Sequence, residues 1–307
     1  MNTYYDVIVI GAGPAGLTAA LYTSRARLST LIIERQVMGG ELASRTLIEN
    51  YPCAVGGVQG PELAKVMTDQ ALSFGAESTF AEVESISVDG DIKTVHTSDG
   101  DFTCKAIIVA SGSKPRCLGV PGEEDYEGMG VFYCETCDGP LYAGKKVVVA
   151  GAGDSGLTGA LVLANYCESV TVVEFMSEPK ASKVLLERAA KDPKISIICG
   201  TAIKEIVGDG EEMTGVMVEN RTTGEKSCIE AGGILVRIGQ VPNTAFMKGT
   251  VELTNRAQIP VDEKLETVIP GIFAAGDVRE YSPMQVSTAV GDGASAALGL
   301  GRYLNAH

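Results

Sequence analysis

The chain has 307 residues, of which 45% are apolar, so it is long enough for two domains with sizeable cores and is not a disordered chain. Its net charge of −14 argues against nucleic acid or an anionic membrane as the main partner, because both require a basic surface. No apolar run reaches the ~18 residues of a membrane-spanning helix, and Met1–Asp6 lacks the basic residues of a secretion signal.

The N-terminal segment predicts a strand, a glycine turn, a helix and a second strand. Val7–Ile10 is a buried run typical of a parallel strand, and a GxGxxG turn follows over residues 11–16. The helix is predicted over 14–27, and the second strand, Leu31–Ile33, ends at Glu34. Glycines allow the tight turn and bring the backbone close to a pyrophosphate, which the positive end of the helix attracts.

Residues 145–174 repeat this plan. Val147–Ala150 predicts a strand, residues 151–156 form a second GxGxxG turn, and another strand ends at Glu174. The first glycine of the turn and the acidic residue lie 23 positions apart in both units. A lone glycine turn is weak evidence, but the repeated pattern predicts two mononucleotide-binding units. The alternative is a turn that only packs helix on strand, and it is more credible for the second unit.

Antiparallel hairpins are predicted after each unit. Residues 81–104 alternate apolar and polar side chains between Asp-Gly turns, and residues 195–238 repeat the pattern. A strand over 271–275 and a Gly/Ala-rich helix over 285–304 follow without a glycine turn of their own. This last segment therefore completes the first domain.

The predicted fold class is α/β, with two Rossmann-like dinucleotide-binding domains. Each domain has three layers, in which a parallel sheet lies between helices and an antiparallel β-meander. Residues 1–114 and 245–307 form the first domain, and residues 115–244 form the second, which is inserted in the first.

Two acidic residues of the first domain are candidate ligands of a dinucleotide. Glu34 is predicted to accept hydrogen bonds from an adenosine ribose, with a solvated carboxylate as the alternative. Asp277 follows the small residues of the last strand and can bind a sugar-alcohol hydroxyl, with a helix cap as the alternative. The helix that opens near Gln285 would then direct its positive end at the N1/O2 edge of an isoalloxazine and stabilise the reduced anion.

The most specific motif is Cys134-Glu135-Thr136-Cys137-Asp138-Gly139. A redox-active disulfide fits it best, because a CxxC pair permits a small reversible ring. A zinc knuckle needs four ligands, yet the chain has one CxxC, and its two histidines are His96 and His307. Two inert buried thiols are the other alternative. No histidine lies near the motif, so Asp138 is the candidate acid for proton transfer, with a plain turn residue as the alternative.

The remaining cysteines are scattered singly and are predicted to be small buried residues. They are Cys53, Cys104, Cys117, Cys167, Cys199 and Cys228. Such sparse cysteine usage does not suit a disulfide scaffold and favours a cytoplasmic, reducing location.

Over nearly its whole length the chain closely resembles the low-molecular-weight thioredoxin reductases. The matching segments are residues 11–16, 39–40, 49–52, 110–112, 134–139, 151–156 and 267–277. The resemblance implies a homodimer with FAD on the first domain, a nicotinamide cofactor on the second, and a rotation between the domains. It also implies that Cys137 exchanges electrons with the flavin and that Cys134 attacks the disulfide of a thioredoxin-like protein.

Two departures from the family concern the electron donor. Glu174-Phe175-Met176 stands where the family usually has a His-Arg-Arg run for the 2′-phosphate of NADPH, and Met284 stands where it usually has Arg. NADH is therefore predicted to be preferred over NADPH, because Glu174 would accept the ribose hydroxyls and repel a phosphate. Residues 171–182 contain no arginine, and Lys180 is the nearby cation.

Two other functions stay open. A ferredoxin-linked reductase of the same fold is the second enzyme hypothesis, although a chain of charge −14 would repel an acidic ferredoxin. A flavoprotein that senses nucleotide without turnover is the alternative from another class, but sensing does not require a dithiol.

The candidate residues follow from the motifs and the resemblance together, and no metal site is predicted. The catalytic candidates are Cys134, Cys137 and Asp138. The candidates for FAD are Gly11, Gly13, Pro14, Ala15, Gly16, Glu34, Arg35, Gly39, Gly40, Glu41, Leu42, Asn50, Ala110, Ser111, Gly112, Gly276, Asp277, Met284, Gln285 and Val286. The candidates for the nicotinamide cofactor are Gly151, Gly153, Asp154, Ser155, Gly156 and Glu174.

Overall fold

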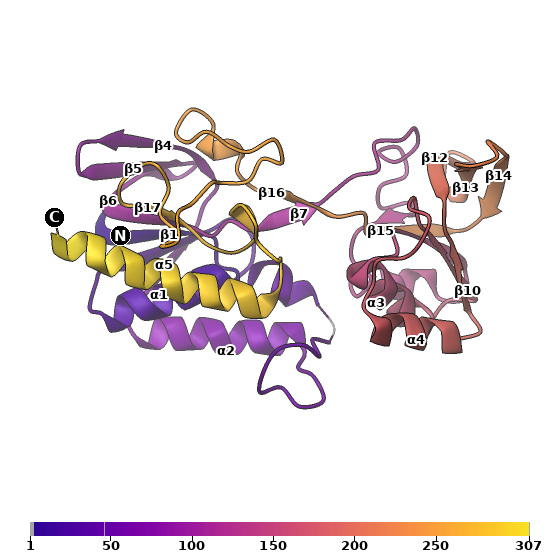
Figure 1. The fold of residues 1–307 in the computed structure, drawn as a ribbon, viewed down its shortest axis with the longest axis horizontal. Coiled ribbons are helices and arrows are strands. Elements are labelled where there is room, and N and C mark those ends of the chain that lie inside the picture. Colours follow the sequence, from indigo (N-terminus) through magenta and orange to yellow (C-terminus); the bar gives the residue numbers. More distant parts are fainter. Residues whose placement is uncertain (1–2, 46, 307) are drawn as a thin grey trace. The chain divides into compact units, whose positions relative to one another are not determined.

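The computed structural model describes residues 3–45 and 47–306, so Met1, Asn2, Thr46 and His307 lie outside the described residues. The chain divides into two compact units, and the second is inserted in the first (Figure 1). The first unit consists of Met1–Lys114 and Val241–His307, and the second of Pro115–Gln240. The chain thus crosses into the second unit after Lys114 and crosses back after Gln240. The second crossing is close to the position after residue 244 that is expected from the sequence. The short strands β7 (Ser113–Pro115) and β16 (Gln240–Pro242) pair at the crossings.

The helices and strands of the first unit are β1 (Tyr4–Ile10), α1 (Pro14–Arg25), β2 (Thr30–Glu34), α2 (Gly60–Ser73), β3 (Glu77–Phe80), β4 (Val83–Asp89), β5 (Ile92–Thr97), β6 (Gly100–Val109), β17 (Ile272–Ala274) and α5 (Val286–Ala306). Its sheet has the order β3–β2–β1–β6–β5–β4, and β17 also pairs with β6. Strands β3, β2, β1, β6 and β17 are parallel, whereas β4 and β5 join antiparallel. The long strand β6 has room for both, because β5 pairs with its first half and β17 with its last three residues.

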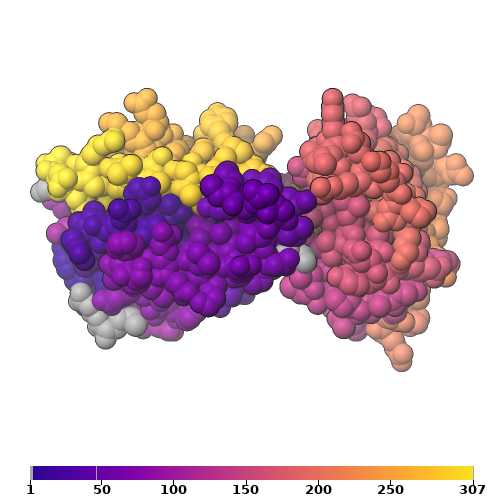
Figure 2. Space-filling view, turned by 90° about the horizontal axis from the view of Figure 1, so that it is seen from below, coloured from indigo at the N-terminus to yellow at the C-terminus, as the bar shows by residue number. Residues whose placement is uncertain are grey.

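Alternation along β1 divides the core of this unit between two faces. Val7 and Val9 pack in one cluster with residues of α1 and α5, whereas Ile8 and Ile10 pack with Ile86 of the antiparallel strands. Helices α1, α2 and α5 lie together on one face of the sheet (Figure 1). In the space-filling view, the yellow C-terminal helix lies directly against the indigo and purple N-terminal segment (Figure 2). The last segment therefore completes the first unit.

The elements of the second unit are β8 (Val131–Phe132), β9 (Lys146–Ala150), α3 (Asp154–Leu163), β10 (Ser169–Val173), α4 (Lys183–Lys191), β11 (Ile195–Ile198), β12 (Thr201–Gly208), β13 (Met213–Asn220), β14 (Lys226–Glu230) and β15 (Gly233–Val236). A parallel sheet has the order β11–β10–β9–β15–β8, and β12–β13–β14 form a separate antiparallel sheet. Val147 packs on the helical side, and Val148 packs toward Val216 of the antiparallel sheet. This arrangement confirms the predicted three-layer α/β fold.

One part of the predicted second meander is wrong. Residues 195–198 and 233–236 are not antiparallel strands but β11 and β15 of the parallel sheet. β15 is buried along its whole length, as is typical of a strand inside a parallel sheet. β11 follows α4 and completes a crossover from β10. Its short alternating pattern is the one expected of a hairpin strand, which explains the error.

The glycine turns owe their shape to close backbone contacts that are the same in both units. A Cβ on Gly16 would clash with the carbonyl oxygen of Gly11, and a Cβ on Gly156 with that of Gly151. The first glycine of each turn has a φ of about +100°, which L side chains rarely adopt. In contrast, a Cβ on Gly153 would meet nothing within 4 Å. The first and third glycines are therefore required by the fold, whereas the second borders open space.

None of the helices in the described part of the chain combines the length and apolar character needed to cross a membrane.

The carboxyl ends of the parallel strands indicate where ligands bind. Strands β1, β2, β6 and β17 all end at one edge of the first sheet, and β8, β9, β10 and β15 at one edge of the second. In open α/β sheets, ligands bind beyond these carboxyl ends.

Alanine at the second and third glycines of the second turn should therefore have different effects. We expect Gly156→Ala to lower the free energy of unfolding by about 2 kcal/mol, as overpacking does. Gly153→Ala should change it by less than about 0.5 kcal/mol, yet weaken nucleotide binding several-fold, because its Cβ enters the space over the helix N-terminus. Urea unfolding and calorimetric titration with NADH measure the two effects. Equal losses of stability in both variants would contradict this assignment.

Candidate active site

The two strand-end carboxylates make the same hydrogen bonds in the two units. Glu34 accepts the N–H of Ala12 in the first glycine turn at 2.8 Å and the N–H two residues further along the chain at 2.9 Å. Glu174 likewise accepts the N–H of Ala152 at 2.6 Å and the N–H two residues on at 2.8 Å. Each carboxylate is thus fixed beside its glycine turn, and its remaining lone pairs can accept the hydroxyls of a ribose.

The helices that follow the turns begin without a side-chain cap. Gly13 is the N-cap of α1 and Gly153 the N-cap of α3, and neither helix has a side-chain cap hydrogen bond. A Cβ on either glycine would meet nothing within 4 Å. Free N–H groups, a positive helix end and open space are the features that bind a pyrophosphate. Pro14, Ala15, Asp154 and Ser155 lie in these first turns.

The loop after Glu34 comes back to the first turn. The N–H of Gly39 donates to the carbonyl of Ala12 at 2.8 Å, and Gly40 opens a short 3₁₀ helix that contains Glu41 and buried Leu42. Arg35 is not drawn to the turn, because it lies 3.6 Å from Glu82 in an exposed ion pair. These backbone contacts place the loop beside the first glycine turn, and its role in binding FAD stays a prediction.

Asp277 lies at the carboxyl edge of the first sheet, just after β17. Its carboxylate accepts the hydroxyl of Ser113 at 3.0 Å, and burial raises its pKa. The preceding N–H, of Gly276, donates to Asp292 at 3.1 Å, and Arg279 binds the same carboxylate at 2.6 Å. Asp292 and Arg279 were not predicted, although a lone acidic residue in a Gly/Ala-rich helix was a possible signal. They hold the loop that presents Asp277.

Residues far apart in the sequence meet around the start of α5. The amide of Asn50 donates to the side chain of Gln285 at 2.9 Å, next to Val286 and to Met284, whose φ is +55°. Ala110, Ser111 and Gly112 follow β6. The hydroxyl of Ser111 donates to the carbonyl of Asn243 at 2.7 Å. The structure therefore ties Asn50 to the N-terminal end of α5, and Ser111 to a partner that the sequence did not suggest.

Cys134 and Cys137 form a disulfide with their Cα atoms 5.3 Å apart. The pair follows β8, so it lies at the same sheet edge as the second glycine turn. The N–H of Cys137 donates to Sγ of Cys134 at 3.1 Å, and such a donor stabilises negative charge on that sulfur once the disulfide opens. Among residues 3–45 and 47–306, no group of three or more His, Cys, Asp or Glu side chains could hold a metal ion; His307 lies outside these ranges.

Asp138 is held beside the disulfide, and its N–H donates to the carbonyl of Cys134 at 3.0 Å. Burial raises the pKa of its carboxyl above the ordinary value. The side chain borders a cavity of about 200 Å³ together with Tyr133, Leu141 and Tyr142. Tyr142 stacks on Phe132 with ring centroids 4.5 Å apart, which gives this cavity a rigid aromatic wall. An acid with a raised pKa can still carry a proton where an ordinary aspartate has lost it.

The predicted burial of the single cysteines is wrong for three of them. Cys104 and Cys167 are buried and Cys199 is half-buried, but Cys53, Cys117 and Cys228 are exposed. The exposed ones lie in loops or on an outer strand of the antiparallel sheet, where no core residue is needed.

A cation that was not predicted lies beside Phe175, the residue after Glu174. Arg221, in the turn after β13, stacks its guanidinium 3.7 Å from the centre of the Phe175 ring. It also donates to the carbonyl of Phe175 at 2.9 Å, and its own N–H donates to Gly200 at 2.8 Å. The side chain is thus fixed one residue beyond Glu174. The backbone N–H of Lys180 donates to the carbonyl of Ala152 in the second turn at 3.2 Å.

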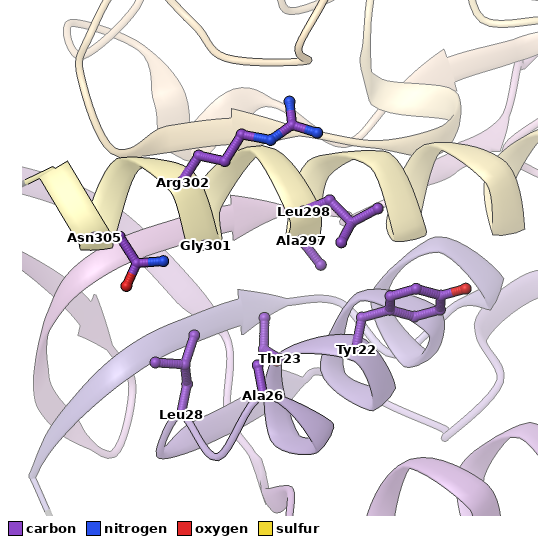
Figure 3. A pocket seen from close by; sticks show the side chains of 9 residues that line it. All are labelled: Tyr22, Thr23, Ala26, Leu28, Ala297, Leu298, Gly301, Arg302 and Asn305. Carbon is purple, nitrogen blue, oxygen red and sulfur yellow. The ribbon is translucent and has the colours of Figure 1, made fainter.

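A groove of about 250 Å³ lies between α1 and α5, away from the predicted residues (Figure 3). Tyr22 and Leu28 line it from the end of α1 and beyond, and Leu298 and Arg302 from the second half of α5. The predicted cofactor residues lie at the opposite, N-terminal ends of both helices. The groove is therefore not part of the candidate active site.

Comparisons with known proteins agree with this geometry. The family described as pyridine nucleotide-disulphide oxidoreductase matches residues 5–293. The thioredoxin reductase of Listeria monocytogenes is 41% identical over 301 residues, which cover 98% of this chain and 94% of that protein. The crystal structure of Lactococcus lactis thioredoxin reductase matches with a TM-score of 0.97 and 39% identity, covering 99% of this chain and 100% of that chain. That of T. acidophilum thioredoxin reductase matches with a TM-score of 0.95 and 38% identity, covering 99% of both chains. The chain therefore belongs to the pyridine nucleotide-disulphide oxidoreductase family, among its thioredoxin reductases.

Proposed function

We propose that this protein reduces the disulfide of a thioredoxin-like protein, with electrons passing from a nicotinamide dinucleotide through FAD to the Cys134–Cys137 pair. The observation that carries the proposal is the disulfide itself, placed at the carboxyl edge of the sheet that presents the second glycine turn. When bound, FAD accepts a hydride from a nicotinamide and passes two electrons to a disulfide. Homodimer assembly and a cytoplasmic location stay predictions, based on the resemblance and on the sparse cysteines.

The residues of the first unit fit FAD. The open space over Gly13 and the uncapped end of α1 suit its pyrophosphate. Glu34 suits the adenosine ribose, and Asp277 suits a ribityl hydroxyl. The N-terminal end of α5 offers a positive dipole to the flavin ring.

The dithiol then reduces its partner by two exchange steps. The thiolate of Cys134 attacks one sulfur of the partner's disulfide, which forms a mixed disulfide and releases one partner thiolate. Cys137 then attacks Sγ of Cys134, so the Cys134–Cys137 disulfide forms again and the second partner thiolate leaves. Asp138 in its acid form gives a proton to a leaving thiolate. A hydride from the donor, which carries two electrons and one proton, and a second proton from solvent restore the dithiol.

Two alternatives make different use of the same fold. A ferredoxin would have to approach a chain of net charge −14, which repels an acidic partner unless a basic patch intervenes. A nucleotide sensor would bind both cofactors, yet it has no use for the Cys134–Cys137 disulfide. The dithiol therefore favours a reductase over a sensor.

NADH is the donor that we infer. Glu174 is held by two backbone N–H groups, so it cannot easily swing away from a 2′-phosphate. At ~4 Å and an effective dielectric of ~20, each like-charge pair costs about 4 kcal/mol. Screening by salt and a shift of the phosphate on the ligand reduce this to about 2 kcal/mol, or roughly 30-fold in affinity. Arg221 opposes the effect, because its guanidinium lies over Phe175 beside that position.

The cysteine roles predict separable defects. Cys134→Ser should keep bound FAD and its reduction by the donor, but lose thioredoxin reduction, because the attacking sulfur is gone. Cys137→Ser should lose turnover and also the charge-transfer interaction between the thiolate of Cys137 and the flavin. Steady-state turnover with a thioredoxin and anaerobic flavin absorbance measure the two steps. Thioredoxin reduction by Cys134→Ser near the wild-type rate would refute these roles, and no turnover by the wild type would favour the sensor.

The role of Asp138 predicts a pH-dependent defect. Asp138→Asn should bind both cofactors normally but turn over more slowly by roughly 10²–10⁴, the usual effect of removing a general acid. In the wild type, the acid form is lost as pH rises through the raised pKa, so this part of the rate should fall with rising pH. Asp209, an exposed turn aspartate of the same unit, serves as control through Asp209→Asn. Equal rates of Asp138→Asn and the wild type over about pH 6–9 would reduce Asp138 to a turn residue.

The charges of Glu174 and Arg221 should have opposite effects on the preference for NADH over NADPH. Wild type should have a higher kcat/KM with NADH than with NADPH, and Glu174→Arg should reverse or abolish this preference. Arg221→Ala should lower kcat/KM with NADPH more than with NADH, because it removes the fixed cation. Anaerobic titration with NADH, NADPH and reduced ferredoxin measures the choice directly. Equal or better use of NADPH by the wild type contradicts the prediction, and flavin reduction by ferredoxin alone would favour the ferredoxin-linked enzyme.

A further inference from the structure

A buried ion pair lies inside the redox motif. Glu135 stands between the two cysteines in the chain, and its side chain is only 3% exposed. Arg237 pairs with it, and that side chain is 4% exposed. Nε of Arg237 donates to Oε2 of Glu135 at 3.1 Å, and Nη2 donates to the same oxygen. The CxxC segment is therefore anchored in the interior of the second unit by a charged residue.

The sheet explains why these two distant residues meet. β8 and β15 are neighbouring parallel strands, with Phe132 opposite Leu235, so the segments that follow them leave the sheet at the same edge. The N–H of Arg237 also donates to the carbonyl of Ala150 at 2.9 Å, and a Cβ on Gly151 would crowd the carbonyl of Arg237. Arg237 thus contacts the redox segment through its side chain and the second glycine turn through its backbone.

Stability alone does not account for this pair. Well-packed apolar residues in place of a buried ion pair usually give equal or greater stability. Arg237 adds a further cost, because its Nη1 is buried and has no hydrogen-bond partner within the described part of the chain. Two opposite charges beside a disulfide do, however, cancel each other's effect on the stability of a thiolate formed when the disulfide opens.

We propose that Glu135 and Arg237 are positioning residues that hold the CxxC segment and balance its charge, and so set the equilibrium between disulfide and dithiol. Opening the disulfide takes up two electrons and one or two protons, and leaves two thiols or one thiol and one thiolate. An unbalanced guanidinium stabilises the thiolate and hence the reduced form, whereas an unbalanced carboxylate destabilises it. The Cα of Glu135 lies one peptide, about 3.8 Å, from that of Cys134. The inference rests on the proposed use of Cys134 and Cys137 as a redox couple.

The test measures the redox equilibrium of the FAD-containing protein in mixtures of reduced and oxidised dithiothreitol, without nicotinamide or thioredoxin. Anaerobic quenching and alkylation count the thiols of Cys134 and Cys137. Glu135→Gln should shift the equilibrium constant toward dithiol by about tenfold, the scale of one unbalanced charge within ~10 Å. Arg237→Met should shift it toward disulfide by a similar factor. The double variant should return to within about twofold of the wild type.

Two controls separate charge balance from folding. Glu230→Gln removes the partner of Lys146 from an exposed ion pair of the same unit and should shift nothing. Arg237→Lys keeps the charge, so the proposal requires a wild-type equilibrium constant from this variant even if every other variant fails to fold. A purely structural pair would lower the unfolding temperature of the single variants without shifts of opposite sign.

Three results would overturn the proposal. They are shifts of the same direction in both single variants, a double variant displaced as far as either single one, and a tenfold shift in Arg237→Lys. If the single variants do not fold, Arg237→Lys decides the outcome: a wild-type equilibrium constant supports the proposal, and a tenfold shift overturns it. If wild-type Cys134 and Cys137 do not exchange with dithiothreitol at all, the proposed function itself is wrong, which is a different outcome.

Discussion

The hydrogen bond from a glycine turn to a strand-end carboxylate determines how each nucleotide site is built. In both units the turn must bend sharply, and the N–H that follows its first glycine needs an acceptor. Glu34 and Glu174 provide that acceptor from the end of the neighbouring strand. The bond fixes the turn against the sheet, so the uncapped helix end that follows keeps its N–H groups for a ligand. Without it, neither the pyrophosphate site nor the ribose site would have a defined position.

Parallel pairing then decides which residues share one edge. In the second unit, β8, β15, β9 and β10 end together, so the redox segment, Arg237, the glycine turn and Glu174 follow neighbouring strands. The proposed donor site and the dithiol are therefore parts of the same small domain. Asp138 belongs to this edge as well, and burial raises its pKa.

What the sequence could predict was local. The glycine turns, their acidic residues and the CxxC pair were found because short-range chemistry requires those residue types at those spacings. Pairs that form between distant segments were missed, since no local pattern marks them. Glu135 and Arg237 are 102 residues apart, and Phe175 and Arg221 are 46 apart. The misread strands β11 and β15 have the same cause, because four apolar-rich residues do not reveal whether the neighbouring strand is parallel or antiparallel.

The two nucleotide sites use the same hydrogen bonds, so their difference lies in the charges around them. Near Glu174, two carboxylates add negative charge, because burial and, after it, Glu174 and Glu178 raise the pKa of Cys199. Arg221 is the fixed positive charge beside this region, and it is already engaged with the carbonyl and ring of Phe175. A guanidinium stacked on a ring keeps donors at its edge, so it can contact a ligand without moving. We therefore expect discrimination between two nucleotides at this proposed site to depend on the balance between Glu174, Glu178 and Arg221, rather than on a single specificity residue.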